Sequence, residues 1–326
     1  MLLLGLTLSG CEAKVSPDEE VKALVKSLLK EMVYVKGGSF TRGCVTEKEE
    51  LMKLLPKNIV EYMNPKTGNK PDFQFWGYGG CWPRHKVTLD GFNLAKFETS
   101  WKEFDFYTQI EKLPTVQPNL KKRKYVRRLP DKAANLGWHQ ADRYCKWLAK
   151  VSGLPFGLPT EAQWEYAATN RGKFIPYGTD TGYWEKGVNV PKDRKEKRKM
   201  AARETKYPPN PLGIYHLGDS VAEWTSDWYA PYTKEPKINP KGPKINPKGP
   251  KTGTGKIIKG FGGIAGPSWD RGESPIMLSD SAMKINKNIL GMSPTREDAT
   301  RLDSEGVRCA LHLDRPITQK DIDAVK

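Results

Sequence analysis

The sequence predicts a folded chain of mixed helices and strands that are joined by many loops. Its 326 residues can build one large core or two ordinary ones, and 37% hydrophobic residues with ten Trp exclude a mostly disordered chain. Thirty Gly and 25 Pro argue against a helix bundle. Some segments place apolar residues at helical spacing and others alternate strictly, which predicts both element types. No apolar run reaches the roughly 18 residues that span a membrane.

Four helices are predicted from capping signals, from apolar spacing or from both. The first is the clearest, because Ser16, Pro17 and Glu19 supply the preferred cap, first and third residues of a helix. Its apolar stripe ends at Met32, so residues 12–31 are expected to form an amphipathic tether ahead of the main domain. The other helices are predicted at 100–107, 136–151 and 160–168.

Strands are predicted where apolar and polar residues alternate, or where a short apolar run ends in glycines. Residues 85–92 alternate with a period of two, which is typical of a strand with one buried face. Further strands are predicted at 32–40, 257–263 and 306–311.

Basic residues are concentrated in segments that are predicted to be loops. The net charge is +16, and the runs 121–128 and 192–199 are both strongly basic. A heptapeptide at 237–243, Lys-Ile-Asn-Pro-Lys-Gly-Pro, recurs unchanged at 244–250; two copies are too few for a solenoid, so a stiff basic loop is expected. Together with the polar, loop-like residues after Cys44, these features predict surface insertions at about 45–80, 118–132, 190–205 and 235–252.

The first eleven residues resemble the signal peptide of a bacterial lipoprotein. A short apolar run, Leu2 to Leu8, is followed by Ser9-Gly10-Cys11, in which small residues precede the Cys that would be lipidated. This pattern predicts a lipid anchor on Cys11 and a periplasmic protein, and Glu12 favours the outer membrane of a Gram-negative bacterium. A frayed apolar N-terminus of a cytosolic protein is the alternative.

The remaining four Cys are expected to lie in a compartment that permits disulfides. Cys44 and Cys81 stand in Gly-rich, loop-like surroundings, and we expect a bridge between them. Cys145 falls on the apolar face of a predicted helix, where a buried free thiol is expected. A bridge between Cys145 and Cys309 is the alternative.

Two long and unusual blocks lie in the second half of the chain. Residues 158–168 read Leu-Pro-Thr-Glu-Ala-Gln-Trp-Glu-Tyr-Ala-Ala, and residues 210–228 contain Glu-Trp-Thr-Ser-Asp-Trp. With shorter pieces on either side, and in the same order, they resemble the formylglycine-generating enzyme family, also called the sulfatase-modifying-factor family, over roughly residues 32–315. The resemblance implies one compact α+β domain, related to C-type lectins and low in regular secondary structure, followed by a tail at 316–326.

Residues 262–305 match the region in which the family's oxidase carries its active site. That oxidase holds copper(I), a soft metal, between two closely spaced thiolates. No Cys occurs in this region, and the resemblance places Cys145 and Cys309 at structural positions of the family. We therefore expect no copper and no oxidase activity, which would make the chain a pseudoenzyme.

The resemblance also implies structural calcium, which the family binds through carbonyl and carboxylate oxygens. In one of its sites the matching residues are Asp219 and Glu223, within Gly-Asp-Ser-Val-Ala-Glu-Trp. Asn189 and Val190 resemble the start of a second site, but basic residues replace its downstream acid. Hydrogen bonding at turns and helix ends is the alternative role of Asp219 and Glu223.

A family member without the oxidase chemistry is best interpreted as a protein-binding module. The expected role is an immunity lipoprotein that neutralises a type VI secretion toxin such as a phospholipase, or a regulator of a secretion system. An enzyme of the formylglycine-generating type, or another metal-dependent enzyme with a relocated site, is the alternative. The partner is expected to be a protein, with membrane contact through the lipid anchor only and no nucleic acid. Candidate partner contacts, for which solvated loops are the simpler reading, are Lys121, Lys122, Arg123, Lys124, Arg127 and Arg128.

Overall fold

The computed structural model describes most of the predicted domain. The described residues are 16–42, 85–116, 128–173, 175, 177–182, 185–217, 219–228, 244–245, 247–252, 256–260 and 305–325. Cys11, Cys44, Cys81 and all seven residues of the repeat copy at 237–243 lie outside them, as do residues 121–127.

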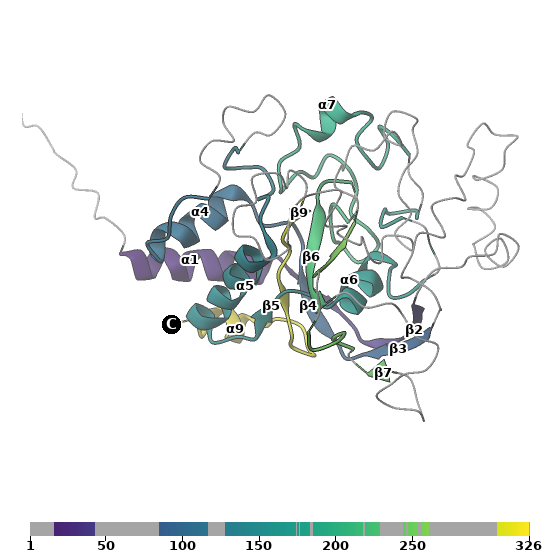
Figure 1. The fold of residues 1–326 in the computed structure, drawn as a ribbon, viewed down its shortest axis with the longest axis horizontal. Helices are drawn as coiled ribbons and strands as arrows, with labels where there is room; N and C mark the ends of the chain where they lie inside the picture. The colour runs from purple at the N-terminus through teal and green to yellow at the C-terminus, as the bar shows by residue number, and fades with distance from the viewer. Residues whose placement is uncertain are drawn as a thin grey trace, which may run out of the picture.

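Three small sheets form the centre of the molecule (Figure 1). The first has the order β1-β4-β10-β5, with β1 Met32–Val35, β4 Phe92–Ala95, β10 Ala310–Leu311 and β5 Phe156–Gly157. The second has the order β2-β3-β7, with β2 Gly38–Arg42, β3 His85–Leu89 and β7 Lys244–Ile245. The third has the order β8-β6-β9, with β8 Lys256–Lys259, β6 Ala222–Trp228 and β9 Glu305–Gly306. Because β1 and β10 both pair with β4, the two ends of the described chain meet in one sheet.

The helices lie on two sides of these sheets. Figure 1 shows a group of four on one side, α1 Pro17–Lys30, α4 Trp101–Ile110, α5 Trp138–Ser152 and α9 Gln319–Asp323. Helix α6 Glu161–Ala168 lies on the other side, against β6 and β8, and the short α7 Arg194–Lys197 stands apart at the top of the view. The α+β fold class is therefore confirmed. In the described residues no helix is both long and apolar enough to cross a membrane.

The predicted helix starts are confirmed by local hydrogen bonds. Ser16 accepts a bond from the backbone of Glu19, as the first capping signal predicts. Full capping boxes open α4 at Ser100 and α6 at Thr160, because each cap and the third residue of the helix bind each other's backbone. Helix α5 ends at Gly153, whose φ of 70° suits glycine.

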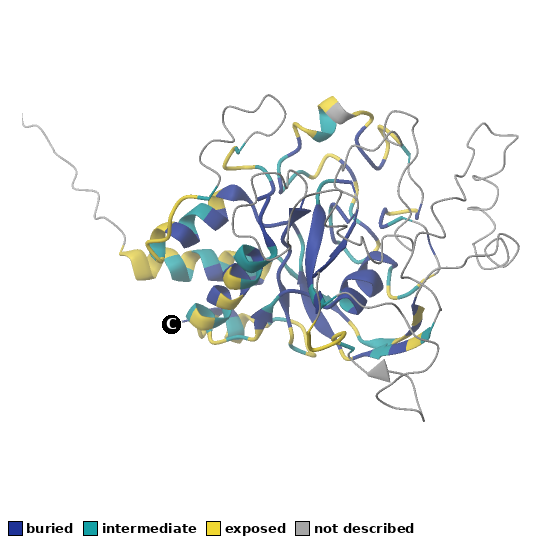
Figure 2. Ribbon diagram, in the orientation of Figure 1, coloured by how far each residue is buried: buried dark blue, intermediate teal, exposed yellow. Residues whose placement is uncertain are grey.

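Two hydrophobic clusters make up the core (Figure 2). The larger one lies among the four grouped helices and includes Val25 and Leu29 of α1, so the predicted tether helix is packed into the body of the domain. The smaller one lies between α6 and the strands β2 to β4. Trp101, Trp164 and Trp224 are among the largest fully buried side chains, and burying such rings contributes a few kcal/mol each.

A disulfide joins Cys145 of α5 to Cys309, which directly precedes β10. The expectation of a free thiol at Cys145 is therefore wrong, and the alternative pairing is the one found. An apolar helix face did not exclude a bridge, because Cys309 is also buried and the two Cα atoms lie 5.7 Å apart. The bridge closes a loop of 164 residues, which fixes the last strand against the large helical cluster.

Candidate functional site

The centre of the domain is a buried ion pair between Glu223 and Arg308. Glu223 lies in β6 and Arg308 in the segment between β9 and β10, and both are fully buried. The Arg308 guanidinium donates to both Glu223 carboxylate oxygens, from Nε at 3.0 Å and from Nη2 at 2.8 Å. It also donates to the carbonyls of Ala95 and Tyr215, each at 2.8 Å. Burial alone would lower the pKa of Arg308, but Glu223 outweighs it and raises the pKa.

Each of the two long blocks supplies a buried tryptophan near this ion pair, and the one in α6 bonds to it directly. Trp164 of α6 donates its indole N–H to Glu223 at 2.7 Å, and Trp224 donates to the carbonyl of Leu136 at 2.7 Å. These bonds satisfy the polar atoms of rings that are otherwise buried in apolar surroundings. Both blocks therefore serve the scaffold in this geometry.

A second buried network lies beside the first and joins β2, α6 and β8. Lys259 is 3.2 Å from Glu165 and 3.7 Å from Glu161, and Arg42 pairs with the same two carboxylates. Asp227 accepts a bond from the backbone N–H of Glu161 at 2.9 Å. Burial, together with repulsion from Glu161, raises the pKa of Asp227 to about 6.

A cluster of Glu98, His216 and Asp219 adjoins the Glu223–Arg308 pair. His216 Nδ1 lies 3.4 Å from Asp219, and the other ring nitrogen lies 2.8 Å from the carbonyl of Glu204. Burial alone would lower the pKa of His216, but Asp219 and Glu98 outweigh it and raise the pKa to about 9. Burial and the neighbouring Glu223 raise the pKa of Glu98 to about 7.

The residues matched to the first calcium site thus already have cationic partners. Arg308 and Trp164 occupy both oxygens of Glu223, and protonated His216 faces Asp219. A calcium ion would have to displace these groups, so this geometry fits the ion poorly. Within the described residues, no group of three or more His, Cys, Asp or Glu is arranged to hold a metal ion. Calcium binding here stays a prediction.

The residues matched to the second calcium site hold a surface turn together. The Asn189 side chain accepts from the backbone of Glu185 at 2.9 Å and donates to Asp180 and Thr181. The Val190 carbonyl accepts from the backbone of Gly187 at 2.7 Å. The structure therefore places Asn189 and Val190 in turn hydrogen bonds, and calcium at this position also stays a prediction.

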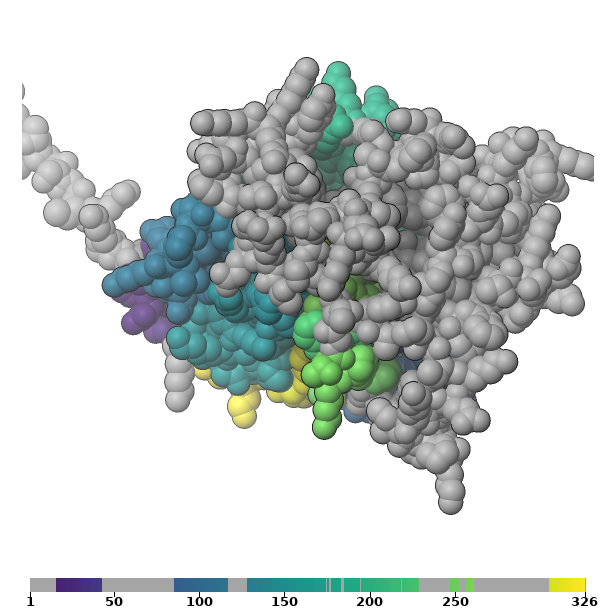
Figure 3. Space-filling view, in the orientation of Figure 1, coloured from purple at the N-terminus to yellow at the C-terminus, as the bar shows by residue number. Residues whose placement is uncertain are grey.

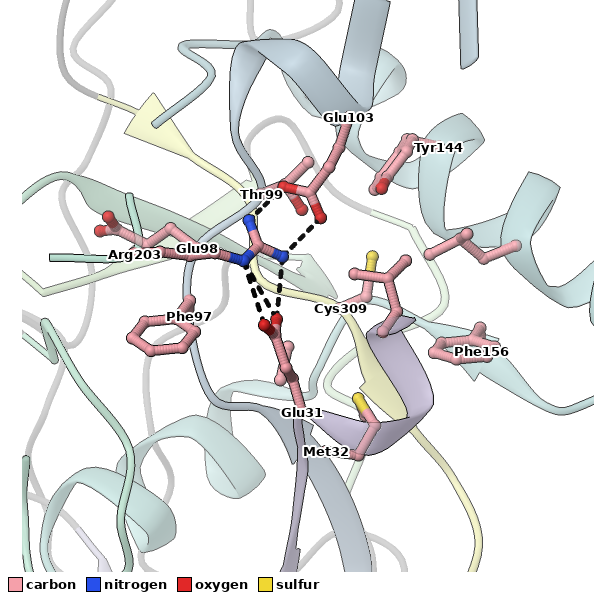
Figure 4. Close-up of a pocket in the computed structure, with 13 residues that line it drawn as sticks. Glu31, Met32, Phe97, Glu98, Thr99, Glu103, Tyr144, Phe156, Arg203 and Cys309 are labelled. Carbon is pink, nitrogen blue, oxygen red and sulfur yellow. Dashed lines mark hydrogen bonds and ion pairs between the residues drawn. The ribbon is translucent and has the colours of Figure 1, made fainter. Parts of the chain in front are cut away.

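A small pocket of about 20 Å³, partly open to solvent, lies where α1, α4 and α5 meet (Figure 4). Figure 4 shows the Arg203 guanidinium between Glu31 at the end of α1 and Glu103 in the first turn of α4. It donates two bonds to Glu103 at 2.9 Å and three to Glu31 at 2.9–3.2 Å. Because both carboxylates are bound this way, Arg203 works as a clamp that fixes α1 to the domain.

The interior of this pocket is mostly apolar. Its walls include Leu28, Met32, Leu148, Phe156 and Cys309 of the disulfide. The buried Tyr144 hydroxyl lines the same pocket and makes no hydrogen bond of normal geometry among the described residues. The Thr99 side chain is near enough to affect the pKa of this hydroxyl. Burial, with Glu103 nearby, raises the pKa of Tyr144 well above its usual value.

Sequence reasoning missed Arg203, Glu98, Arg42 and Lys259. Each pairs with residues that are far away in the chain, such as Arg203 with Glu31 across 172 positions. Glu98 lies in a short piece of the family resemblance, Phe-x-Leu-x-x-x-Glu-Thr at 92–99, but that pattern does not indicate its partners. For Lys259 the available signal was a charge that follows two Ile.

Of the six candidate partner contacts, only Arg128 is described. Its guanidinium donates to Asp105 at 2.7 Å and to the carbonyl of Val116 at 2.9 Å, and it lies 4.3 Å from the ring centre of Trp101. These contacts hold the end of a loop against α4, and contact of Arg128 with a partner stays a prediction. The remaining candidates, Lys121, Lys122, Arg123, Lys124 and Arg127, lie outside the described residues.

Comparison with known proteins decides the family. Residues 17–310 match the model of the sulfatase-modifying factor enzyme 1-like domain. The chain belongs to this family. It is 30% identical over 119 residues to the formylglycine-generating enzyme of Bos taurus, covering 33% of this chain and 30% of that protein. It is 29% identical over 114 residues to the inactive C-alpha-formylglycine-generating enzyme 2 of Mus musculus, covering 32% of this chain and 34% of that protein.

The likeness extends further in structure than in sequence. PvdO from Pseudomonas aeruginosa superimposes with a TM-score of 0.55 at 20% identity, covering 86% of this chain and 94% of that chain. This identity is low, so the match supports the family fold alone. The alignments to the bovine and mouse proteins span only about a third of those relatives, and those relatives include one that is named inactive.

Proposed function

We propose that this member of the sulfatase-modifying-factor family is a non-catalytic, lipid-anchored periplasmic protein that binds another protein. One observation carries the proposal: Cys145 and Cys309, the last two Cys in the chain, are bonded to each other. A copper(I) site of the family's kind needs two thiolates, and residues 262–305 contain none. The family fold is retained, whereas Cys145 and Cys309 are bonded to each other and residues 262–305 supply no other thiol.

The proposed partner is a secreted toxin, such as a type VI secretion phospholipase, which the chain neutralises as an immunity protein. The second possibility is a component of a secretion system that the chain regulates. Lipidation at Cys11 would hold the domain at the outer membrane of a Gram-negative cell. Helix α1 begins six positions after Cys11 and is packed into the core, which supports a short connection between anchor and domain. The mouse relative that is named inactive supports a family role that does not depend on catalysis.

The test is purification of the full, lipidated chain from its membrane in detergent, with identification of any protein that stays bound. The expected result is one stoichiometric partner that is absent from a mock purification. A Cys11→Ser variant should appear in the soluble periplasmic fraction, which tests the anchor separately.

The same preparation tests the enzymatic alternative. The purified chain is incubated with copper or iron and a Cys-containing peptide, and both oxygen uptake and peptide mass are followed. We expect neither to change. Conversion of the Cys to an aldehyde would overturn the proposal.

A further inference from the structure

Residues 185–200, which we call the apex segment, form an anchored surface feature. Asn189, Val190 and Met200 are buried and hold the segment to the domain, whereas most of the residues between them are exposed. Its helix α7 stands at the top of the molecule in Figures 1 and 3. The anchoring gives the exposed side chains a defined platform.

The exposed charges of this platform are predominantly basic. Lys186, Lys192, Lys195 and Lys199 are exposed, and none of the four has an acidic partner among the described residues. The turn at Gly187 and the residues before α7 lie together, because a Cβ added to Gly187 would lie 3.6 Å from the Cβ of Lys192. The turn that follows Lys186 therefore lies beside Lys192, and the exposed Lys195 and Lys199 follow in the same segment.

The acids of the apex segment serve its own backbone. Asp193 accepts from the backbone of Glu196 at 2.8 Å, and Glu196 accepts from the backbone of Lys192 at 2.9 Å. Glu196 also pairs with Lys206, whose hydrogen bond is the main reason that the pKa of Glu196 is lowered to about 2. These carboxylates stabilise the platform and leave the lysine ammonium groups exposed.

Residues 131 and 132, which follow the other basic run in the sequence, lie against the apex segment. Lys132, four residues after the end of the run 121–128, donates its ammonium to the carbonyls of Lys199 and Met200. The backbone of Ala202 donates to the carbonyl of Asp131 at 2.7 Å. Asp131 and Lys132 therefore lie against the C-terminal end of the apex segment, about 70 positions away from it in the sequence.

An exposed apolar side chain stands among these charges. Val188 is 66% exposed, more than any other large hydrophobic side chain in the described part of the chain. It follows Gly187, whose φ of 79° forms the tip of a turn that the Lys186–Val190 bridge closes. An apolar centre within a polar or charged rim is typical of a protein–protein interface, whereas binding of phosphate relies on cations and polar donors and does not need an apolar side chain.

We propose that the apex segment docks an acidic surface of a partner protein, with Val188 entering a small apolar depression on that partner. The lysines meet carboxylates around the rim, which increases the association rate and selects acidic partners. This inference rests on the proposed binding function and names the face that performs it.

The experiment measures binding of the full chain, in detergent, to a short fluorescent peptide in which Glu residues flank one Leu. Lys192→Glu/Lys195→Glu/Lys199→Glu should weaken binding about tenfold or more. The matched control Lys112→Glu/Lys150→Glu/Lys320→Glu changes net charge equally on exposed lysines elsewhere and should leave affinity within about twofold. Equal losses in both variants would mean that only net charge matters and would overturn the proposal.

The role of Val188 is tested by comparing the affinities of the Leu peptide and of the same peptide with Ala in place of Leu. A Val188→Ser variant should lose the preference for the Leu peptide over the same peptide with Ala, and should bind the Ala peptide like the parent chain. Anionic lipid vesicles and a single-stranded DNA serve as rival probes; tighter binding of either one through the apex lysines would contradict a protein partner. If the co-purification recovers a protein whose affinity is unchanged by these substitutions, the proposed function stands but the apex segment is not the face that binds.

Discussion

Lys259 and Lys195 are the same residue type in opposite settings. Lys259 is fully buried between Glu161 and Glu165 in the centre of the fold, whereas Lys195 is exposed on the apex segment. A buried charge is compatible with folding only when its partner is present, because water cannot replace that partner. An exposed charge is solvated either way and is free to be used in binding. Burial, not residue type, thus separates the charges that specify this fold from those that can recognise a partner.

The largest expected effect is at the Glu223–Arg308 pair. Arg308→Met leaves the Glu223 carboxylate buried with the Trp164 N–H as its one remaining partner among the described residues, so we expect a loss of about 3–5 kcal/mol in the free energy of unfolding, or failure to fold. Urea unfolding followed by Trp fluorescence measures it. If the single variant does not fold, Arg308→Met/Glu223→Gln should recover folded protein, because it removes both charges. A single variant as stable as the parent chain would show that the pair is not buried as described.

The disulfide is the covalent counterpart of this buried pairing. Cys145→Ser/Cys309→Ser releases a loop of 164 residues in the unfolded chain, and we expect a loss of about 2–5 kcal/mol. Urea unfolding of the double variant and the parent chain, both without reductant, gives the difference. As a control, mass spectrometry of unreduced peptides should find Cys145 linked to Cys309 in the parent; a link of either one to another Cys would contradict the structure.

His216 allows a further comparison of buried and exposed charges, because raising the pH removes its proton and with it the buried positive charge. Its folded-state pKa of about 9 exceeds the usual 6.5, so the folded chain binds the proton more tightly than the unfolded chain. The resulting stability, on the order of 3 kcal/mol, is complete below pH 6.5 and is lost as the pH rises through about 9. Melting curves across this range test it.

His216→Asn is the matched control for this pH dependence. His216 has a φ of 63°, a backbone conformation that Asn tolerates. The variant should therefore fold but lose most of the decline in stability between pH 6.5 and pH 9. The same alkaline decline in both proteins would assign it to another group.

The contrast between local and distant contacts also explains what the sequence could predict. The caps at Ser100 and Thr160 were predictable, because both partners lie within three residues. The Arg203 clamp was not, because a charged side chain does not indicate which of 38 acidic residues it will meet after folding. The Cys145–Cys309 bridge lies between these cases. A chain with few Cys allows few pairings, yet the position of Cys145 on a predicted helix favoured a free thiol, which is wrong.

The same limit applies to the candidate site. The structure places Asp219 and Glu223 in one buried region, but the family resemblance could not reveal that Arg308 and His216 would fill the space around their carboxylates. A motif specifies residue types along the chain, whereas the charge balance of a buried site depends on every element packed against it.

Calcium gives a smaller expected effect. If calcium binds at Asp219 and Glu223, the melting temperature should be higher in calcium than in chelator, by a few degrees for a gain of about 1 kcal/mol. Asp219→Asn should reduce that gain while retaining a side chain for the local hydrogen bonds. Identical melting curves with and without chelator would eliminate calcium, in agreement with cationic partners from the chain itself.

The smallest effect on stability is expected at the apex segment. Lys192→Glu/Lys195→Glu/Lys199→Glu reverses three charges, yet these ammonium groups are solvated and have no acidic partner in the described residues, so the free energy of unfolding should change by less than about 0.5 kcal/mol per substitution. Urea unfolding beside the Arg308→Met variant makes the comparison direct. A loss approaching that of Arg308→Met would mean that the apex lysines are part of the scaffold. Unchanged stability with weakened peptide binding is the result that separates a recognition surface from a folding determinant.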